Sequence, residues 1–379
     1  MKVLVVTDIH IHIINEKKFL SKQIFHIIKR YYDAFGDVVL FCREDRSLSN
    51  EEMLPAEDIV SDHIGFKNFF GLFFGEGKDL LEQIIRQSDL IVGRFHSFSA
   101  CAAASIARKN GKPFLAEIMG DAWDGYWNHG LYGKIIAPVI FARTKKAIKH
   151  ANYGLYVTER YLQKKYPCRG CCIGASNVEI DCVENIVLEQ RIQKLKQFDK
   201  THIVLMTAAN ADVRAKGHEY VIKAIPKLRK KGITVEYLIA GGGNTSYLKG
   251  IAKTLGVLDS VVFLGRLSSK EVREWMDRCD FYVQPSLQEG LPRAVIEAMS
   301  RACPCLGSNT AGTPELLSVD CVFKRKSSNA IAKKIEWYIN QDLIIYAKRN
   351  FENAKNYTNS ILNSRRNAFF SRIRAELDK

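Results

Sequence analysis

Two glutamates, Glu289 and Glu297, lie eight residues apart around a turn that could hold a phosphate group. An apolar run predicts a strand over 281–284, and Pro292 is expected at the first residue of a helix. Helix N-termini offer free N–H groups to phosphate, and Gly290 lets the backbone come close. Eight residues of helix would span about 12 Å, which is of the order of the distance between ribose and sugar in a nucleotide-diphosphate sugar. A carboxylate at each end, with backbone amides between them, therefore predicts a site for such a ligand.

A lysine and two further turns add to this pattern. Lys216-Gly217 precede a helix-like segment, where an ammonium adds to the positive field of the helix N-terminus. That field suits a leaving group that gains negative charge. Gly312-Thr313-Pro314-Glu315 is a second strand-to-helix turn with an early proline. Gly241 to Gly243 also follow a strand, although a glycine-rich turn by itself is commonly just a tight turn.

The stretch over residues 280–317 resembles the signature of glycosyltransferase family 4. The matching residues read PS, EGLP, IEAM, PC and GTPELL, and a weaker likeness covers most of residues 200–320. This is the E-x7-E motif of retaining GT-B enzymes, and it resembles that of bacterial polysaccharide-biosynthesis glycosyltransferases. The resemblance implies transfer of a sugar from a nucleotide-diphosphate sugar to a glycan or undecaprenyl-linked glycan acceptor. It also implies a reaction that needs no metal and no cofactor, within surface-polysaccharide assembly.

The resemblance assigns roles to residues at the matching positions. It gives the donor sugar hydroxyls to Glu289, the ribose hydroxyls to Glu297 and the departing diphosphate to Lys216. The family's usual arginine before this lysine has no direct match, so Arg214 and Asn210 stay open as its replacement. The remaining residues expected to bind the donor are Gly242, Arg266, Leu267, Gly290, Leu291, Pro292 and Thr313.

The N-terminal half resembles the family only in two short segments and in its coarse pattern. His96 follows a strand where the family often carries a histidine, so it joins Glu289, Lys216 and Arg214 as a candidate catalytic residue. A histidine in an apolar stretch is also commonly structural, and both roles stay open. Asp121 stands where the family often has His-Asp, although Gly120 replaces the histidine. The expected acceptor-binding residues are Asp8, His10, Asp121 and Trp123.

The start of the chain offers an alternative function. Asp8 and His10 directly follow an apolar run, and such an Asp-x-His resembles the first metal-binding motif of metallophosphoesterases. The later motifs of that family have only echoes with the wrong spacing, since Asp121 lies more than a hundred residues after Asp8. A metal-dependent phosphoesterase that uses Asp8 and His10 is the alternative, whereas the glycosyltransferase hypothesis expects no metal site.

The order of apolar runs predicts an α/β protein with two similar halves. Strand-like segments cover VLVVTD, DVVLFC, SDLIVGR and KPFLAEI in the first half, and THIVLMTAA, TVEYLIAGGG, SVVFLGR and CDFYVQPS in the second. Helix-like segments lie between them, and one is predicted over residues 16–35. This alternation indicates βαβ units around parallel sheets. We expect a GT-B fold, in which two Rossmann-like domains face each other across a cleft. The predicted domains are 1–185 for the acceptor, 186–355 for the nucleotide sugar, and 356–379 as a helix that packs back on the first.

The composition and charge of the chain indicate which classes of partner are expected. The 379 residues are 47% hydrophobic and carry a net charge of +15, which suits a globular protein with an anionic partner. No nucleic-acid-binding motif is visible, so nucleic acid is not an expected partner. The basic, apolar run after Gly130 could lie on an anionic membrane, but helix-end cations are also expected from the dipole alone. Without a visible signal peptide or span, we expect a cytoplasmic protein, with peripheral contact at the inner membrane face as a further expectation.

Overall fold

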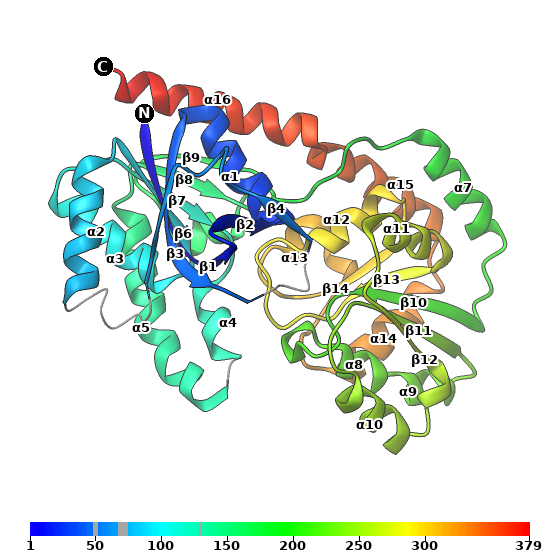
Figure 1. Ribbon diagram of the computed structural model, residues 1–379. Helices are drawn as coiled ribbons and strands as arrows, with labels where there is room; N and C mark the ends of the chain where they lie inside the picture. The colour runs from blue at the N-terminus through cyan, green and yellow to red at the C-terminus, as the bar shows by residue number, and fades with distance from the viewer. Residues whose placement is uncertain (48–51, 67–74, 129) are drawn as a thin grey trace. The chain divides into compact units, whose positions relative to one another are not determined.

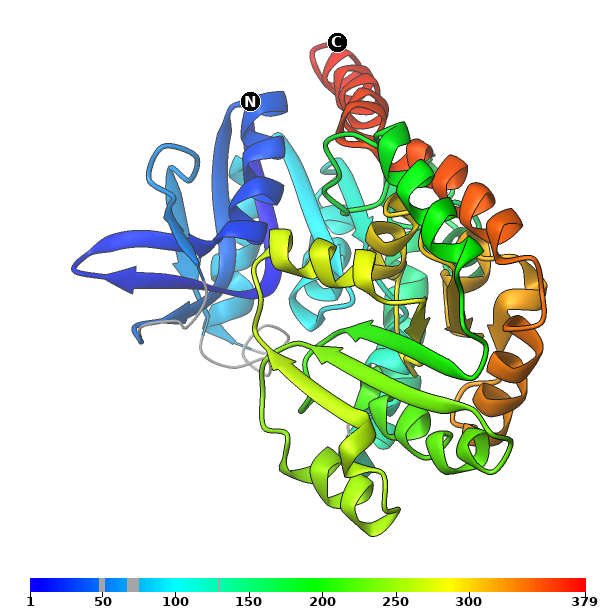
Figure 2. The same ribbon diagram turned by 90° about the vertical axis from the view of Figure 1, so that its right-hand side faces the viewer.

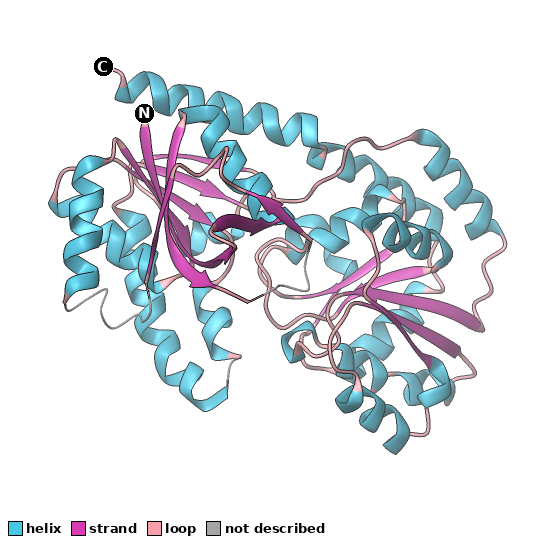
Figure 3. Cartoon of the chain, in the orientation of Figure 1, coloured by secondary structure: helices cyan, strands magenta, loops and turns pink. Residues whose placement is uncertain are grey.

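The computed structural model describes residues 1–47, 52–66, 75–128 and 130–379, and they form two compact units (Figure 1). Unit 1 contains residues 1–175 and 364–379, and unit 2 contains residues 176–363. In each unit, helices lie on both sides of a central sheet (Figure 3). None of the helices in the described ranges is both long enough and apolar enough to cross a bilayer.

The described residues of unit 1 form a nine-stranded sheet. Seven strands are parallel neighbours in the order β5-β3-β1-β6-β7-β8-β9, and their runs of buried apolar residues are typical of a sheet covered on both faces. Their bounds are β1 Lys2–Ile14, β3 Asp37–Asp45, β5 Asp62–Gly65, β6 Leu90–Phe95, β7 Phe114–Ile118, β8 Tyr153–Tyr156 and β9 Cys171–Gly174. The order reverses between β1 and β6, as in a doubly wound fold.

The start of unit 1 differs from the prediction. β1 runs through Asp8 and His10 to Ile14 instead of ending before them, and β2 (Lys17–Ser21) pairs with it antiparallel. The predicted helix over 16–35 is therefore wrong for its first residues, and α1 covers only Lys22–Phe35. Asn15 and Glu16 both have positive φ, at 48° and 62°, which is the backbone of a two-residue hairpin turn. β4 (Met53–Pro55) then pairs with the outer side of β2.

Helices cover both faces of the unit 1 sheet. α2 (Glu76–Gln87), α3 (Phe98–Lys109) and α5 (Gly130–Lys149) lie on one face, and α1 lies on the other (Figure 1). Short helices α4 (Ala122–Trp127) and α6 (Tyr161–Lys165) follow β7 and β8. The last helix, α16 (Asn359–Leu377), packs beside α1, because the Phe370 ring lies 5.6 Å from Tyr31 and 5.3 Å from Phe35. Tyr153 also donates a hydrogen bond of 2.8 Å to Glu376.

Unit 2 contains a six-stranded parallel sheet in the order β12-β11-β10-β13-β14-β15 among the described residues. Figure 2 shows strands of this sheet, green to yellow, running in the same direction. Their bounds are β10 His202–Ala208, β11 Thr234–Ala240, β12 Val261–Gly265, β13 Phe281–Gln284, β14 Cys305–Ser308 and β15 Val322–Phe323. The chain turns back between β10 and β13, so this unit also has a doubly wound order. The predicted α/β class with two Rossmann-like domains is confirmed.

Two layers of helices cover the unit 2 sheet (Figure 1). One layer contains α8 His218–Ile222, α9 Ile225–Arg229, α10 Ser246–Thr254 and α14 Ser328–Tyr338. The other contains α7 Asn185–Lys196, α11 Ser269–Arg278, α12 Arg293–Ser300 and α15 Leu343–Ala354. Two short elements complete the turns after β10 and β14, namely the 3₁₀ helix η2 Arg214–Lys216 and α13 Thr313–Leu316.

Candidate active site

The candidate donor site lies on the loops that follow the parallel strands of unit 2. Carboxyl ends of parallel strands meet at one edge of a sheet, and ligands of doubly wound sheets bind there, where the strand order reverses. β10 and β13 flank that reversal. The loop after β10 carries Asn210, Arg214 and Lys216, and the loop after β13 carries residues 289–292. The topology therefore brings together residues that are far apart in the sequence.

Lys216 and Glu289 contact each other directly. Lys216 Nζ lies 2.8 Å from Glu289 Oε1, as both a hydrogen bond and an ion pair. The Glu289 side chain is 10% exposed and the Lys216 side chain is 32% exposed. A carboxylate and an ammonium therefore stand together at the switch point of the sheet.

The backbone holds these two loops against each other. The Leu287 N–H donates to Ala215 O at 2.7 Å. Gly217 has φ of +75°, and a Cβ at this position would lie 2.2 Å from Pro285 O. Only glycine fits such a left-handed position with a carbonyl so close. The Lys216-Gly217 pair therefore fixes the register between the lysine and the glutamate.

Gln284 is a site residue that the sequence interpretation missed. Its Nε2 donates to Glu289 Oε1 at 3.0 Å and to Ser286 Oγ at 2.8 Å, while its Oε1 accepts from Tyr282 OH at 2.8 Å. The Tyr282 hydroxyl in turn accepts from the Ala208 N–H at 3.2 Å. Gln284 is buried, and the sequence signal that could have revealed it is a polar residue at the end of an apolar run predicted to be a buried strand.

Glu297 lies on α12, but the helix is shorter than predicted. α12 begins at Arg293 with Pro292 as its N-cap, so Pro292 is not the first helical residue. Glu289 belongs to the preceding loop, and the predicted 12 Å of continuous helix between the two glutamates is wrong. Burial raises the pKa of Glu297, against the lowering effect of Arg293 and Arg273. No described residue donates a hydrogen bond to its carboxylate.

The backbone amides near the glutamates differ in their availability. The N–H groups of Gly290 and Leu291 have no hydrogen-bond acceptor among the described residues. Thr313, by contrast, donates its N–H to Thr310 O at 3.0 Å, and its side chain is fully buried. The Thr313 amide is therefore already engaged within its turn, and a contact of Thr313 with the donor stays a prediction. The Gly312 N–H donates to Gly290 O at 2.8 Å, so this turn supports the Gly290 loop instead.

Three neighbouring loops carry the remaining donor-site candidates. The Ala211 N–H donates to Gly242 O and the Gly241 N–H donates to Gly265 O, each at 2.8 Å. These bonds join the loops after β10, β11 and β12, and so bring the exposed Asn210 and Arg266 to the same edge of the sheet. A Cβ on Gly242 would lie 3.8 Å from the Arg266 Cβ, and the next residue, Leu267, is half-buried.

Arg214 has a contact of its own. Its guanidinium Cζ lies 4.1 Å above the centre of the Tyr247 ring, which is a cation–π distance. Tyr247 OH donates to Glu219 at 3.2 Å. Arg214 and Asn210 both lie on the loop after β10, so both stay predictions for the missing arginine of the family.

In unit 1, Asp8 and His10 differ in their contacts and exposure. The Asp8 carboxylate accepts hydrogen bonds from the Phe98 N–H at 3.1 Å and from the Ser99 hydroxyl, at the N-terminus of α3. Burial raises the pKa of Asp8, against these hydrogen bonds. His10 is exposed on β1 opposite Arg43 of β3. Among the residues described, no three His, Cys, Asp or Glu side chains are grouped in a way that could hold a metal ion.

The His96 ring lies close to two glycines and packs against an aromatic ring. A Cβ on Gly125 would lie 2.6 Å from His96 Nε2, and one on Gly120 would lie 3.2 Å from its Cε1. The Tyr126 ring meets the imidazole edge to face at 6.1 Å. Gly120, which replaces the histidine expected from the family, therefore makes room for the His96 ring. The catalytic role of His96 stays a prediction.

Asp121 is engaged by side chains of unit 1, and its acceptor contact stays a prediction. It is fully buried and accepts hydrogen bonds from the Trp123 N–H, Tyr161 OH, Tyr166 OH and Lys165 Nζ. Burial alone would raise the pKa of this carboxyl, but Lys165, Tyr166 and Tyr161 lower it overall. Trp123 is half-buried and stacks on Trp127 at 5.0 Å.

The sequence of this chain is similar to those of several known proteins. The chain matches the model of the family described as Glycosyl transferases group 1 over residues 189–357. Protein CapJ of Staphylococcus aureus is 30% identical over 321 residues, which is 82% of this chain and 79% of CapJ. The amylovoran biosynthesis glycosyltransferase AmsK of Erwinia amylovora is 30% identical over 174 residues, or 44% of this chain and 42% of AmsK.

Solved structures show the fold. Anabaena Alr3699/HepE in complex with UDP is similar with a TM-score of 0.67 and 15% identity, over 98% of this chain and 100% of that one. Sucrose-phosphate synthase from Thermosynechococcus elongatus gives a TM-score of 0.67 at 13% identity, over 99% of both chains. The predicted GT-B fold is thereby confirmed. With the family match and the similarity to CapJ, the chain belongs to the group 1 glycosyl transferases.

Proposed function

We propose that this protein is a retaining glycosyltransferase that moves a sugar from a nucleotide-diphosphate sugar to a glycan or undecaprenyl-linked glycan. Unit 2 binds the donor and unit 1 binds the acceptor. The observation that carries the proposal is the Lys216–Glu289 contact of 2.8 Å at the switch point of the unit 2 sheet. The UDP-glucose complex of the Anabaena relative supports the donor class. The name of AmsK supports a place in surface-polysaccharide assembly.

Each donor-site residue acts on one part of the donor. Glu297, whose carboxylate accepts no hydrogen bond from a described residue, accepts from the ribose hydroxyls. Glu289 accepts from the donor sugar, and the N–H groups of Gly290 and Leu291 donate to the diphosphate. Lys216 stabilises the negative charge that develops on the leaving diphosphate.

The transfer takes place on one face of the sugar. The bond from the anomeric carbon to the phosphate oxygen breaks, and a bond to the acceptor hydroxyl oxygen forms on the same face. The acceptor's proton passes to the leaving phosphate oxygen, so atoms and charge balance. Asp8 and Asp121, the acidic residues expected in unit 1, both have engaged carboxylates. This favours same-face transfer over a double displacement.

A donor screen followed by point variants tests the proposal. Thermal unfolding with a series of nucleotide sugars should identify the donor, because a ligand at a hundred times its Kd adds about 2.7 kcal/mol of stability. With that donor, Lys216→Ala should lower turnover by about 10²–10³-fold, and Glu297→Gln should raise the donor KM. Lys200→Ala and Glu274→Gln change exposed residues of unit 2 and serve as matched controls. Wild-type rates in both site variants would show that the donor site lies elsewhere.

The proposed reaction uses side-chain and backbone charge where other transferases use a metal ion. Lys216 and the amides of Gly290 and Leu291 supply positive potential at the diphosphate. Turnover should therefore be unchanged in EDTA. Loss of turnover in EDTA with recovery in Mn²⁺ would contradict this part of the proposal.

We further propose that unit 1 contacts an anionic membrane on its cytoplasmic side through α5. One exposed face of this helix carries Leu131, Tyr132, Ile135 and Val139, which are 53–78% exposed, and continues into Arg143, Lys146 and Lys149. Apolar residues followed by cations match the acyl boundary and headgroups of an anionic bilayer. Ile135→Ser should weaken sedimentation with phosphatidylglycerol vesicles, whereas Ile345→Ser, at an exposed isoleucine of unit 2, should not.

A further inference from the structure

A cavity in unit 1 lies between the C-terminal ends of α3 and α5. Its volume is about 440 Å³, and a smaller pocket of about 200 Å³ adjoins it through Ala104, Arg108, Ala147 and His150. Pockets that bind small molecules typically measure about 300–1,000 Å³. α3 and α5 both end near the amino ends of the strands, since β7 begins at Phe114, one of the lining residues. The cavity is thus at the opposite edge of the sheet from Asp8 and His96.

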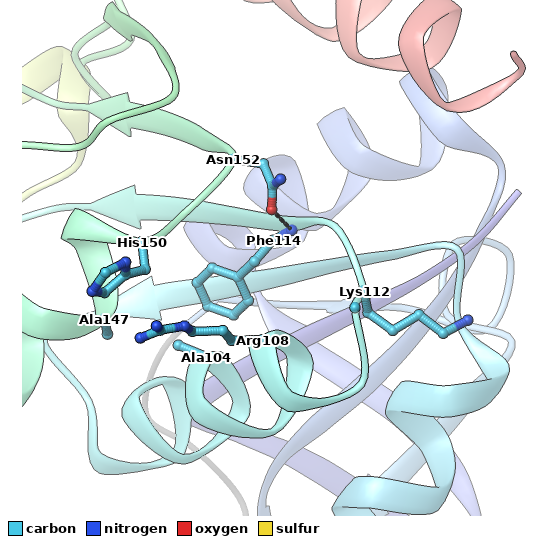
Figure 4. A pocket seen from close by; sticks show the side chains of 8 residues that line it. Ala104, Arg108, Lys112, Phe114, Ala147, His150 and Asn152 are labelled. Carbon is cyan, nitrogen blue, oxygen red and sulfur yellow. Dashed lines mark hydrogen bonds between the residues drawn. The ribbon is translucent and has the colours of Figure 1, made fainter.

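The lining of this cavity is strongly basic. It includes Lys78, Arg108, Arg143, Lys146 and His150, the adjoining pocket adds Lys112, and neither lining has an aspartate or glutamate. Arg108 and Lys146 form no ion pair with any described residue. Lys112 is different, because its Nζ donates to Ser88 O at 3.0 Å. Figure 4 shows Lys112 extending away from the group formed by Arg108 and His150.

Helix dipoles alone do not account for these cations. The C-terminus of a helix is equivalent to roughly half a negative charge, so the ends of α3 and α5 supply about one negative charge together. Five lysine and arginine side chains line the cavity and its adjoining pocket. Positive charge is therefore left over after both dipoles are matched.

The pKa of His150 also indicates positive electrostatic potential in this cavity. Burial lowers the pKa of His150, and neighbouring cations lower it further. These cations are Arg108, Arg169, Lys149 and Lys146. Since the cations repel a proton on the imidazole, the surroundings of His150 are electropositive.

The floor of the pocket leaves room for a ligand. Ala104 and Ala147 face it from the two helices, and the Phe114 ring lies between the Arg108 group and Lys112 (Figure 4). The Asn152 side chain is fixed, because its Oδ1 accepts from the Phe114 N–H at 2.9 Å. Small side chains in a lining that also contains Arg108 and Lys146 leave space for an oxyanion, which a guanidinium can bind through two parallel N–H groups.

We propose that this cavity is a second ligand site, which binds a phosphorylated compound through Arg108, Lys146 and His150. The site is separate from the donor site and does not rest on the proposed transfer reaction. The ligand carries a phosphate or diphosphate group, either as a soluble compound or as an anionic lipid headgroup. The shared chemistry is a multiply charged phosphate oxyanion held by one guanidinium and one ammonium.

Calorimetric titration with inorganic pyrophosphate tests the site. The full chain carries Lys216→Ala in this experiment, so that the donor site contributes little to binding. We expect saturable binding in this background, and a Kd raised by about tenfold or more when Arg108→Ser and Lys146→Ser are added. Both residues are exposed, so folding should be unaffected. The control pair Lys17→Ser and Lys164→Ser removes the same charge elsewhere on unit 1 and should leave the Kd unchanged.

Two outcomes would overturn the site. One is no pyrophosphate binding in the Lys216→Ala background, and the other is equal weakening by the control pair. A second arm separates the sources, using vesicles that contain phosphatidic acid. Arg108 is the diagnostic residue in this arm, because it lies on α3 and not on the α5 face proposed to contact the membrane. A lipid headgroup is the ligand if vesicle binding needs Arg108 and is displaced by pyrophosphate. A soluble phosphorylated compound is the ligand if pyrophosphate binds but Arg108→Ser leaves vesicle binding unchanged.

Discussion

Lys216 Nζ lies 2.8 Å from Glu289 Oε1, although 73 residues separate the two in the chain. β10 and β13, which precede them, are paired neighbours in the sheet of unit 2. The pair joins the cation expected to stabilise the leaving group to the carboxylate expected to hold the donor sugar. Residues that support this contact should therefore affect activity without touching the substrate.

Gly217→Ala should separate the two loops of the site. The new Cβ would lie 2.2 Å from Pro285 O at a φ of +75°, so the Lys216 turn must move. We expect a raised donor KM, together with about 1–2 kcal/mol lost from the free energy of unfolding for the left-handed backbone. Gly232→Ala is the matched control, because its φ is +77° with no atom within 4 Å. A donor KM raised equally in both variants would mean that the Pro285 contact is irrelevant.

Gln284→Met should lower turnover through the orientation of Glu289. The variant removes the 3.0 Å hydrogen bond to Glu289 and leaves the Tyr282 hydroxyl without its acceptor. An unsatisfied buried group costs about 1–3 kcal/mol, so the free energy of unfolding should fall as well. Steady-state kinetics should show kcat changing more than the donor KM. Ser286→Ala removes the other acceptor of the same amide, and a similar loss of kcat there would argue against a positioning role for Gln284.

His218 should make unit 2 less stable in mild acid. The pKa of His218 is lowered from 6.5 to about 4, mainly by burial and also by Lys216, while the backbone carbonyls of Asn210 and Ala209 act in the opposite direction. Its Nδ1 lies 2.9 Å from Tyr237 OH, which donates to Thr207.

The unfolded chain takes up the His218 proton near pH 6.5 and the folded chain does not, so stability falls as pH drops toward 4. The loss between pH 7 and pH 5 should be about 2 kcal/mol. Urea unfolding at the two pH values measures it, and His218→Gln should remove this part of the difference. An unchanged pH dependence in the variant would assign the effect to another group.

The buried pair Arg94 and Glu117 should stabilise unit 1 only when both partners are present. Arg94 Nε lies 2.6 Å from Glu117 Oε2, both side chains are at most 3% exposed, and Tyr31 OH donates to the same oxygen at 3.0 Å. Arg94→Met removes the cation beside this buried carboxylate and should cost about 3–5 kcal/mol, whereas Arg94→Met with Glu117→Gln should cost much less.

The same pair sets a pH dependence. Burial would raise the pKa of Glu117, but Arg94 and the hydrogen bonds hold it below 4.5. The stability from this group is therefore fully present above pH 4.5 and is lost as pH falls through the lower folded-state value. Acid unfolding should shift in the double variant, and an acid midpoint equal to that of the wild type would contradict this account.

The sequence predicted the parts of the fold that depend on neighbours along the chain. Short apolar runs predicted the strands of both sheets, and the prolines and glycines after β13 marked the turn that carries Glu289. The prediction failed over residues 17–21, because a helical spacing of apolar residues also fits a strand in a hairpin. The turn at Asn15 and Glu16 requires a positive φ at both residues, and their residue types do not predict this conformation.

Which side chains meet was decided only by tertiary structure. The sequence named Asp8 and Asp121 by residue type and place, but their carboxylates cap α3 and anchor Tyr161, Tyr166 and Lys165. The sequence by itself determined the residue types at the donor site and the repeated strand-and-helix pattern, because both are local. The strand order placed Lys216 beside Glu289 and brought α3 and α5 together around a basic cavity, because strand pairing and helix packing join segments far apart in the chain.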